Sequence, residues 1–396
     1  MLFTDVIGQD VVKQQLISDT QSGRVPHALM LAGKEGCGAL ELALAFAQYL
    51  LCSGKQIQNE GPSMFEDSST PQHTTLADHA CGQCKSCHMA TILQHPDLHF
   101  VFPIYKKYKA PKSTLCDDFL PEFREWVLQH PYEGFTEWRK ASGAENQQLM
   151  IYESESDAII RKLSLKASQN GYKICIIWLP EKMNNDCANK LLKLLEEPPA
   201  MTIFIMVSER PDLVLQTVRS RTQIIEMPAL TENVIEQALI DRYSILPAEA
   251  KRIAHHANGS MTAALRSITE SGDEKKYYDL FVSLMRRSYA KNVKEMKRWS
   301  EEIADMGRES QKQFLAYSQH MLRENFIYNF HRHEINYMNE AEAQFAVKFA
   351  PFINERNVIG MMEQFQLAYR DIEQNANPKI LFFDLALKMI VLIKNR

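Results

Sequence analysis

Short apolar runs alternate with longer amphipathic stretches through the first two-thirds of the chain. This alternation is typical of a parallel β-sheet with helices on both faces. The apolar runs predict strands at residues 28–32, 98–102, 173–178, 202–207 and 223–227. The amphipathic stretches predict helices at residues 39–51, 157–169, 185–196 and 211–219. Pro198 and Pro199 end the third of these helices, because proline cannot continue one. The pattern therefore predicts an α/β domain.

Two stretches interrupt this alternation. Residues from about 53 to 80 are rich in Ser, Thr, Gln, Asp and Gly, which predicts a flexible loop. Residues from about 103 to 150 contain a basic and aromatic run, Tyr105 to Lys112, followed by further aromatic residues. Lysines beside tyrosines can hold single-stranded nucleic acid through charge and stacking, although a solvated loop explains the run more simply. The pattern does not place this second insert in the fold.

After Pro228 the pattern is helical only. Short helices are predicted at residues 232–242, 248–255 and 261–268, and long amphipathic helices follow Gly272, for example at 313–330 and 342–349. We therefore predict three domains. They are an α/β domain at 1–228 that carries both inserts, a small helical domain at 229–272 and an all-helical domain at 273–396.

Length, charge and hydropathy limit the possible classes of protein. A chain of 396 residues is too long for one compact core, and its net charge of -4 argues against binding nucleic acid through bulk positive charge. The first ten residues lack the basic start and apolar stretch of a signal peptide. The most apolar tail segment, 380–393, is interrupted by Asp384 and Lys388 and is too short to span a bilayer. We expect a cytoplasmic protein, in which thiols stay reduced.

A glycine-rich turn follows the first predicted strand and leads into a helix. Gly33 and Gly38 have the spacing of a P-loop, G-x-x-x-x-G-K-[ST], whose lysine reaches phosphate and whose hydroxyl holds magnesium. Here Ala39 stands in the lysine position and Leu40 in the hydroxyl position. Such a turn can also have only a packing role, so the loop alone does not decide the function.

The strand that would carry the acidic residues of an ATPase also lacks them. Residues 174–177 run into Trp178, and no carboxylate follows until Glu181. These acids would hold the metal and orient water. Their absence, together with that of the lysine and hydroxyl, predicts a chain that does not hydrolyse ATP. The enzymatic alternative is an ATPase with unusual residues such as Lys34 and Glu181, whose turnover would be abolished by Lys34→Ala.

Four cysteines predict a metal site. Cys81, Cys84 and Cys87 follow one another at three-residue spacing, and Cys52 at the end of the 39–51 helix is the natural fourth thiolate of a closed, structural zinc site. Other readings stay open: thiols without metal, a fourth ligand from His79, His88 or Cys116, and an iron–sulfur cluster. The cluster is disfavoured because Thr91 stands where ferredoxins continue with cysteine. A stand-alone zinc-containing nucleic-acid-binding protein is a second alternative function.

Several motifs resemble one family, the bacterial clamp-loader subunits. The motifs are Ile7-Gly8-Gln9, His27-Ala28-Leu29, His95-Pro96-Asp97, Lys182-Met183-Asn184, the run from Ala188 to Pro199, Ser220-Arg221-Thr222 and, more weakly, Asn375 to Pro378. The resemblance covers most of residues 1 to 270 apart from the inserts. It implies an AAA+ α/β domain with a zinc module at about 52–87, a helical lid domain and a helical collar that joins five subunits into a ring.

Within this family the chain resembles the delta-prime class of DNA polymerase III clamp-loader subunits, whose phosphate loop is typically degenerate. The resemblance implies that the chain works with an ATPase subunit and a delta subunit to load a sliding clamp onto primed DNA. It also implies that Arg221, in a Ser-Arg-Cys motif with Thr222 in place of cysteine, reaches ATP bound by a neighbouring subunit as an arginine finger. Arg219 is the nearby competitor for that role.

Overall fold

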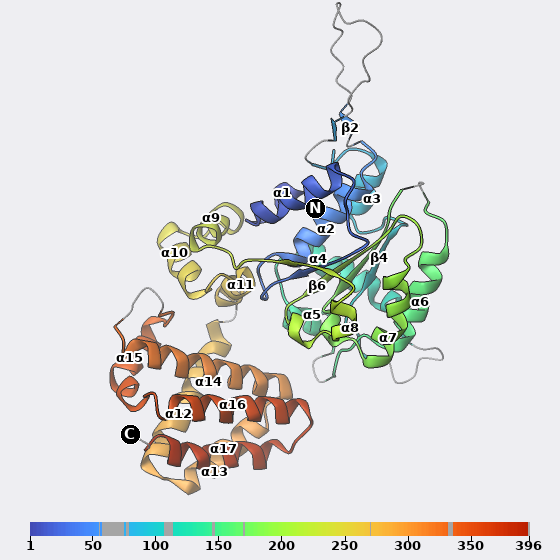
Figure 1. The fold of residues 1–396 in the computed structure, drawn as a ribbon. Coiled ribbons are helices and arrows are strands. Elements are labelled where there is room, and N and C mark those ends of the chain that lie inside the picture. The colour runs from blue at the N-terminus through green and yellow to red at the C-terminus, as the bar shows by residue number, and fades with distance from the viewer. Residues whose placement is uncertain are drawn as a thin grey trace, which may run out of the picture. The chain divides into compact units, whose positions relative to one another are not determined.

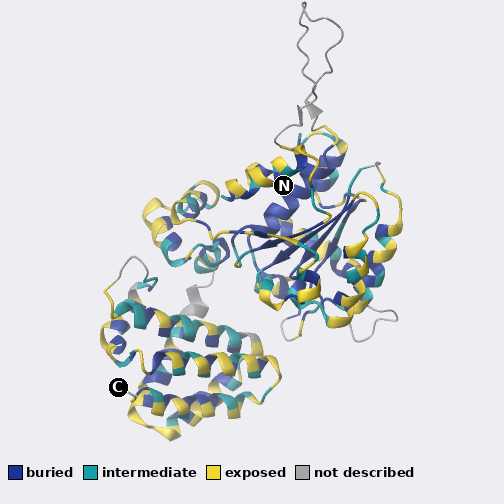
Figure 2. Ribbon diagram, viewed as in Figure 1, coloured by how far each residue is buried: buried dark blue, intermediate teal, exposed yellow. Residues whose placement is uncertain are grey.

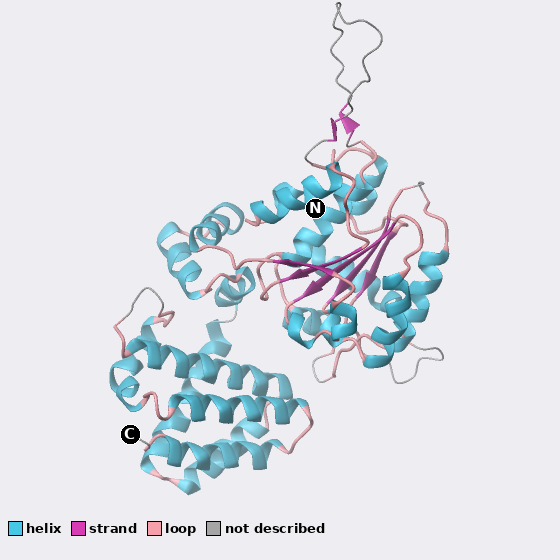
Figure 3. Cartoon of the chain, viewed as in Figure 1, coloured by secondary structure: helices cyan, strands magenta, loops and turns pink. Residues whose placement is uncertain are grey.

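The computed structural model describes residues 1–54, 56–57, 75–76, 79–106, 114–144, 147–168, 171–269, 271–331 and 336–394. The chain separates into two compact units, Met1–Ala254 with Gly259–Ala263 and His255–Asn258 with Ala264–Arg396. The first unit contains the β-sheet, and the described part of the second contains helices without strands (Figure 3). The three-domain division stays a prediction.

The core of the first unit is a five-stranded parallel sheet in the order β4-β5-β6-β1-β7. Its strands are β1 (Ala28–Ala32), β4 (Leu98–Val101), β5 (Lys173–Trp178), β6 (Thr202–Ser208) and β7 (Gln223–Glu226). All of β1, β5 and β6 is buried, as Figure 2 shows, because both faces of a parallel sheet are covered. The predicted parallel-sheet α/β core is confirmed, with strand ends shifted by at most one residue.

Helices cover both faces of this sheet (Figure 1). The helices and 3₁₀ turns before the second insert are η1 (Phe3–Asp5), α1 (Asp10–Gln21), α2 (Ala39–Leu51) and α3 (Lys85–Thr91). Those between the second insert and β7 are α6 (Glu153–Ser164), η3 (Pro180–Lys182), α7 (Asn185–Glu196), η4 (Pro211–Leu213) and α8 (Gln216–Arg219). Three short helices follow β7 and do not cover the sheet: α9 (Glu232–Tyr243), α10 (Pro247–His256) and α11 (Met261–Thr269). Helix α2 is buried along its whole length and packs against β1, β5 and β6. It thereby fixes the loop that precedes it.

Two predicted helices of the first unit differ from the structure by more than one residue. The helix predicted at 157–169 is α6, which begins four residues earlier at Glu153 and ends at Ser164. The helix predicted at 211–219 is broken into η4 and the short α8. Val214 between them is extended and buried in the core, so the chain leaves the helical path to place this side chain.

The second insert folds back onto the sheet. Ile104 and Met150 exchange two backbone hydrogen bonds of 3.0 and 2.9 Å, which brings the ends of the insert together. Between them lie η2 (Cys116–Phe119), α4 (Leu120–Gln129) and α5 (Phe135–Ala141). The buried rings of Trp126 and Trp138 in these helices pack against each other with ring centroids 5.5 Å apart. Described residues of the first insert form a two-stranded antiparallel pair, β2 (Gln56–Ile57) with β3 (Thr75–Leu76).

The second unit has its own hydrophobic core. Its helices are α12 (Ser271–Ala290), α13 (Val293–Ala304), α14 (Arg308–Tyr328), α15 (Glu340–Phe349), η6 (Ala350–Phe352), α16 (Val358–Glu373) and α17 (Pro378–Leu392). Trp299, Phe314 and Phe382 meet at its centre with ring centroids 5.9 to 6.2 Å apart. None of the described helices combines the length and hydrophobicity needed to cross a membrane.

Candidate functional site

The glycine-rich loop connects the end of β1 to the start of α2, as a P-loop does. Gly38 precedes the helix with a φ of 88°, a left-handed conformation that a side chain would strain. Ala39 and Leu40 are the first two helical residues, and both are buried. Neither supplies an ammonium group for phosphate or a hydroxyl for magnesium. The loop therefore lacks the side chains of a working phosphate site.

The end of β5 is aromatic where an ATPase needs carboxylates. Trp178 ends the strand and packs against Trp126 of the second insert, with ring centroids 5.3 Å apart. Glu181 lies in η3, and its carboxylate accepts hydrogen bonds from Ser208 Oγ at 2.9 Å and from the backbone N–H groups of Glu209 and Arg210 at 3.0 and 3.1 Å. These bonds anchor the chain after β6. Among the described residues that line the cavity beside the phosphate loop, Glu181 does not appear.

Sequence reasoning missed two residues of this site, Tyr132 and Glu41. Both line the cavity beside the loop, and both are buried. Glu41 could have been identified from the sequence, because it is an acid in the first turn of the helix that follows the phosphate loop. Tyr132 comes from the insert that the pattern did not place, and no periodicity or motif marks it.

Arg221 follows α8 and pairs with α7 of the same chain. Its Nε donates to Glu196 Oε1 at 2.6 Å, Nη2 donates to the same oxygen, and Nη1 donates to the carbonyl of Thr217 at 2.8 Å. About a third of the Arg221 side chain stays exposed. Arg219 forms an ion pair with Asp212, with 3.8 Å between Nη1 and Oδ1. Arg221 is thus held at the surface by an exposed acid. Its role as an arginine finger stays a prediction.

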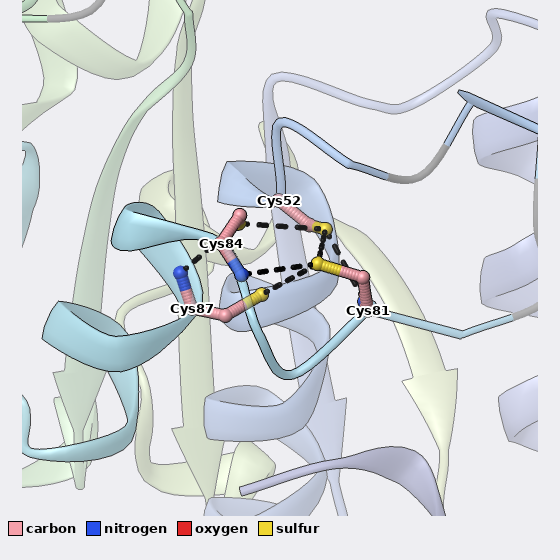
Figure 4. Close-up of side chains that lie close together, drawn as sticks. All are labelled: Cys52, Cys81, Cys84 and Cys87. Carbon is pink, nitrogen blue, oxygen red and sulfur yellow. Dashed lines mark hydrogen bonds between the residues drawn. The ribbon is translucent and has the colours of Figure 1, made fainter.

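The four predicted cysteines converge. Cys52 follows α2 and approaches Cys81, Cys84 and Cys87 around the start of α3, and all four sulfur atoms lie within 4.8 Å of one another (Figure 4). The sulfur of Cys52 is 3.5 Å from that of Cys81 and 4.0 Å from that of Cys84, and Cys81 and Cys87 are separated by 3.9 Å. A tetrahedron of sulfurs around zinc has edges of about 3.8 Å, since Zn–S bonds are about 2.3 Å long. The cluster can therefore hold a metal ion.

The surroundings of the cluster favour thiolates at its exposed side. Burial opposes the charge on Cys84, but hydrogen bonds from Ser53 and from the backbone N–H of Cys87 lower the pKa of Cys84 to about 5. Thiolates are the form that binds metals. The other cysteine considered as a ligand, Cys116, lies elsewhere, and its thiol donates a hydrogen bond to the carbonyl of Phe102 at 3.2 Å. His79 and His88 are exposed and are not part of the cluster found among the described residues.

The basic and aromatic run of the second insert is described only at its start. Tyr105 packs against Phe119 with ring centroids 4.9 Å apart, and the Lys106 ammonium lies 4.6 Å from the centre of the Tyr152 ring. Both residues thus have partners within the chain. Residues 107–113 lie outside the described residues, so single-stranded nucleic-acid binding by this run stays a hypothesis.

Comparison with known proteins gives a consistent result. The sequence profile of the family described as "DNA polymerase III, delta subunit" matches residues 8–231. The chain is 25% identical over 250 residues to DNA polymerase III subunit delta' of Bacillus subtilis, covering 63% of this chain and 56% of that protein. It is 26% identical over 213 residues to the delta' subunit of Escherichia coli, covering 53% and 45%. The chain thus spans about half the length of these relatives.

Among solved structures, the chain is similar to the Holliday junction branch migration motor RuvB of Thermotoga maritima. The identity is 16% and the TM-score 0.37, with 67% of this chain and 62% of that chain covered. Because this TM-score is low, the fold is described from the sheet and helices of the chain itself.

Proposed function

The chain belongs to the DNA polymerase III delta-subunit family, and from this premise we propose that it is a non-catalytic subunit of a clamp-loader complex. The resemblance to delta-prime subunits stated from its motifs is confirmed. The proposed complex loads a sliding clamp onto primed DNA at the expense of ATP bound by other subunits. The proposed partners are an ATPase subunit and a delta subunit in a ring of five.

One observation carries the non-catalytic role. Ala39 and Leu40 occupy the positions of the P-loop lysine and hydroxyl, and the buried Trp178 occupies the strand end that would need carboxylates. Glu181, the first acid after β5 in the sequence, accepts three hydrogen bonds that anchor the chain after β6. Lys34 lines the cavity beside the loop but Glu181 does not, so the two residues on which the alternative ATPase depends do not meet in one site.

Arg221 is the proposed contribution to a neighbouring active site. Its guanidinium is permanently charged and planar, which suits phosphate oxygens. An exposed ion pair such as that with Glu196 is worth only about 0–1 kcal/mol. An arginine finger acting in trans accelerates phosphoryl transfer by roughly 10³ to 10⁵, or about 4–7 kcal/mol. The intramolecular pair is thus weak enough to be exchanged for a neighbour's nucleotide.

The four-cysteine cluster is proposed as a structural zinc module of an AAA+ domain. Cys52, Cys81, Cys84 and Cys87 supply four sulfur ligands, which leaves no open position for a substrate. A zinc ion there would tie the end of α2 to the start of α3 across the polar insert. The helices 229–272 and 273–396 are proposed as the lid and the collar of the same family architecture.

The test uses the reconstituted loader. Arg221→Ala should lower its DNA-stimulated ATPase rate at least about tenfold, while gel filtration shows an intact complex. The matched control is Arg219→Ala, an equally positive neighbour that pairs with the exposed Asp212, and it should leave the rate unchanged. An unchanged rate in the Arg221 variant removes this residue from the chemistry. ATP turnover by the isolated chain overturns the non-catalytic role.

A further inference from the structure

The second insert, for which the family resemblance gives no role, reaches the phosphate loop. Its aromatic helices pack onto Trp178, at the carboxyl end of β5, and ligands of parallel sheets bind at this edge. Between α4 and α5 the chain passes directly over the loop. We propose that the side chain of Tyr132, which lies in this connection, fills the ligand space of the phosphate loop and excludes nucleotide.

Tyr132 is held at three points within the first unit. Its Oη accepts a hydrogen bond from the backbone N–H of Ile7 at 2.6 Å. Its own N–H donates to Glu41 Oε1 at 2.7 Å, and its carbonyl accepts from Thr262 Oγ1 at 2.5 Å. The side chain is 2% exposed. The N-terminal segment, the first turn of α2 and the start of α11 are thereby joined through one residue.

The backbone of Tyr132 is strained in a way that these bonds explain. Its φ is +67°, in the left-handed region that residues with a bulky side chain rarely adopt. Such a conformation persists where surrounding contacts stabilise it, and it occurs often at ligand sites. The three hydrogen bonds stabilise this conformation and hold the ring next to the loop.

The ring lies against the part of the loop that would meet phosphate. A Cβ placed on Gly38 would stand 3.2 Å from Tyr132 Cε1, so the ring lies close to the residue that precedes α2. The N–H groups at a helix N-terminus are the natural anion site of a P-loop. On the other side, the carbonyl of Gly36 accepts a hydrogen bond from Met261 at 3.0 Å, and a Cβ on Gly36 would be 2.3 Å from Ser260 Oγ. The loop is therefore enclosed from both directions.

Glu41 adds a second obstacle. Its carboxyl group is buried in the first turn of α2, on the wall of the same cavity. Burial raises the pKa of Glu41 and so favours its neutral form. Its Oε1 accepts the backbone N–H of Tyr132 at 2.7 Å, which ties α2 to the insert. The Tyr132 ring and the Glu41 carboxyl thus oppose nucleotide by filling the space beside the loop.

The space that remains is too small for a nucleotide. The cavity that remains beside the loop has a volume of about 30 Å³. One water needs about 10–15 Å³ of such a volume, so the cavity has room for roughly two. The missing lysine and hydroxyl are consistent with a loop that no longer meets phosphate.

The first test compares the exposure of the loop in three proteins. In Tyr132→Gly, glycine tolerates the positive φ and keeps both backbone hydrogen bonds, so only the ring is removed. Hydrogen exchange of the 33–41 segment should accelerate at least about tenfold in this variant. The matched control, Leu128→Ala, removes an exposed apolar side chain from α4 of the same insert and should exchange as the wild type does. Equal exchange in Tyr132→Gly and wild type would overturn the proposal.

The second test restores the missing chemistry. Ala39→Lys with Leu40→Thr should gain no protection of the 33–41 segment from millimolar Mg-ATP, and adding Tyr132→Gly should produce that protection. Protection of the wild type, or of the double variant with Tyr132 in place, would show that the ring does not exclude nucleotide. The same conclusion follows if the triple variant exposes the loop but binds no ATP. These measurements need no partner subunit, so their outcome is independent of the proposed clamp-loader role.

Discussion

Replacing Cys87 by Ser should remove a tightly held metal ion from the chain. Cys87 is fully buried at the start of α3, so the loss of its sulfur opens the cluster on its protected side. The sulfur separations of 3.5, 3.9 and 4.0 Å bracket the edge of about 3.8 Å expected around zinc. The wild type should therefore carry one zinc ion per chain, and the variant should lose it to a mild chelator.

The size of the effect follows from mass action. A metal at 1,000 times its dissociation constant stabilises the folded state by about 4 kcal/mol. For a unit of roughly 150–250 residues, each kcal/mol moves the melting temperature by about 2–4 °C, so the expected loss is about 8–16 °C. A strong chelator should lower the melting temperature of the wild type by a similar amount and should leave Cys87→Ser almost unchanged.

The assay combines elemental analysis of the purified protein with thermal unfolding. The matched control is Cys187→Ser, because Cys187 is also fully buried but lies in α7, away from the cluster. This variant should keep its zinc. The reasoning is refuted if the wild type purifies without metal, or if the two serine variants retain the same amount of zinc.

Three further predictions concern stability. Burial raises the pKa of Glu155 from 4.5 to about 7, so the folded chain holds this proton more tightly than the unfolded chain and loses stability as the pH rises from about 4.5 through 7. Glu155→Gln, which keeps an acceptor for the Cys116 N–H, should flatten this part of the profile in chemical denaturation at several pH values, whereas the exposed Glu153→Gln should not. Arg221→Ala should change the free energy of unfolding by less than about 1 kcal/mol, because its partner Glu196 is exposed, and a larger loss in urea titration would make the residue structural. Trp138→Ala should cost about 3–5 kcal/mol in the same titration, since the ring is fully buried and its Nε1 donates to the carbonyl of Pro103 at 2.9 Å; a cost near zero would contradict the packing described for the insert.

Much of the first unit could be predicted because its signals are local. The strands are short, almost wholly apolar runs, and α2 and α7 begin and end at the predicted residues, where Gly38 and Asn184 precede them and Pro198 follows the second. The metal cluster could also be predicted, because Cys81, Cys84 and Cys87 follow one another at three-residue spacing in one short segment. Cys52 was found from its place at the end of α2.

The second insert could not be predicted because its order comes from distant contacts. Its α4 and α5 are short, and they are held by a cluster of rings in which Trp126 contacts Trp178, 52 residues further along the chain. Tyr132 is bonded to Ile7, which is 125 residues away in sequence. Neither periodicity nor spacing carries such information. Val214 shows the same limit on a smaller scale, since burial of one side chain breaks a helix that local pattern favours.

We propose that a clamp loader needs this chain although the chain does not hydrolyse ATP itself. The most direct measurement is the amount of sliding clamp retained on primed circular DNA after incubation with ATP and a loader reconstituted with or without this chain. Clamp should be retained only when the chain is present, and the isolated chain should retain none. Equal loading without the chain would contradict the account.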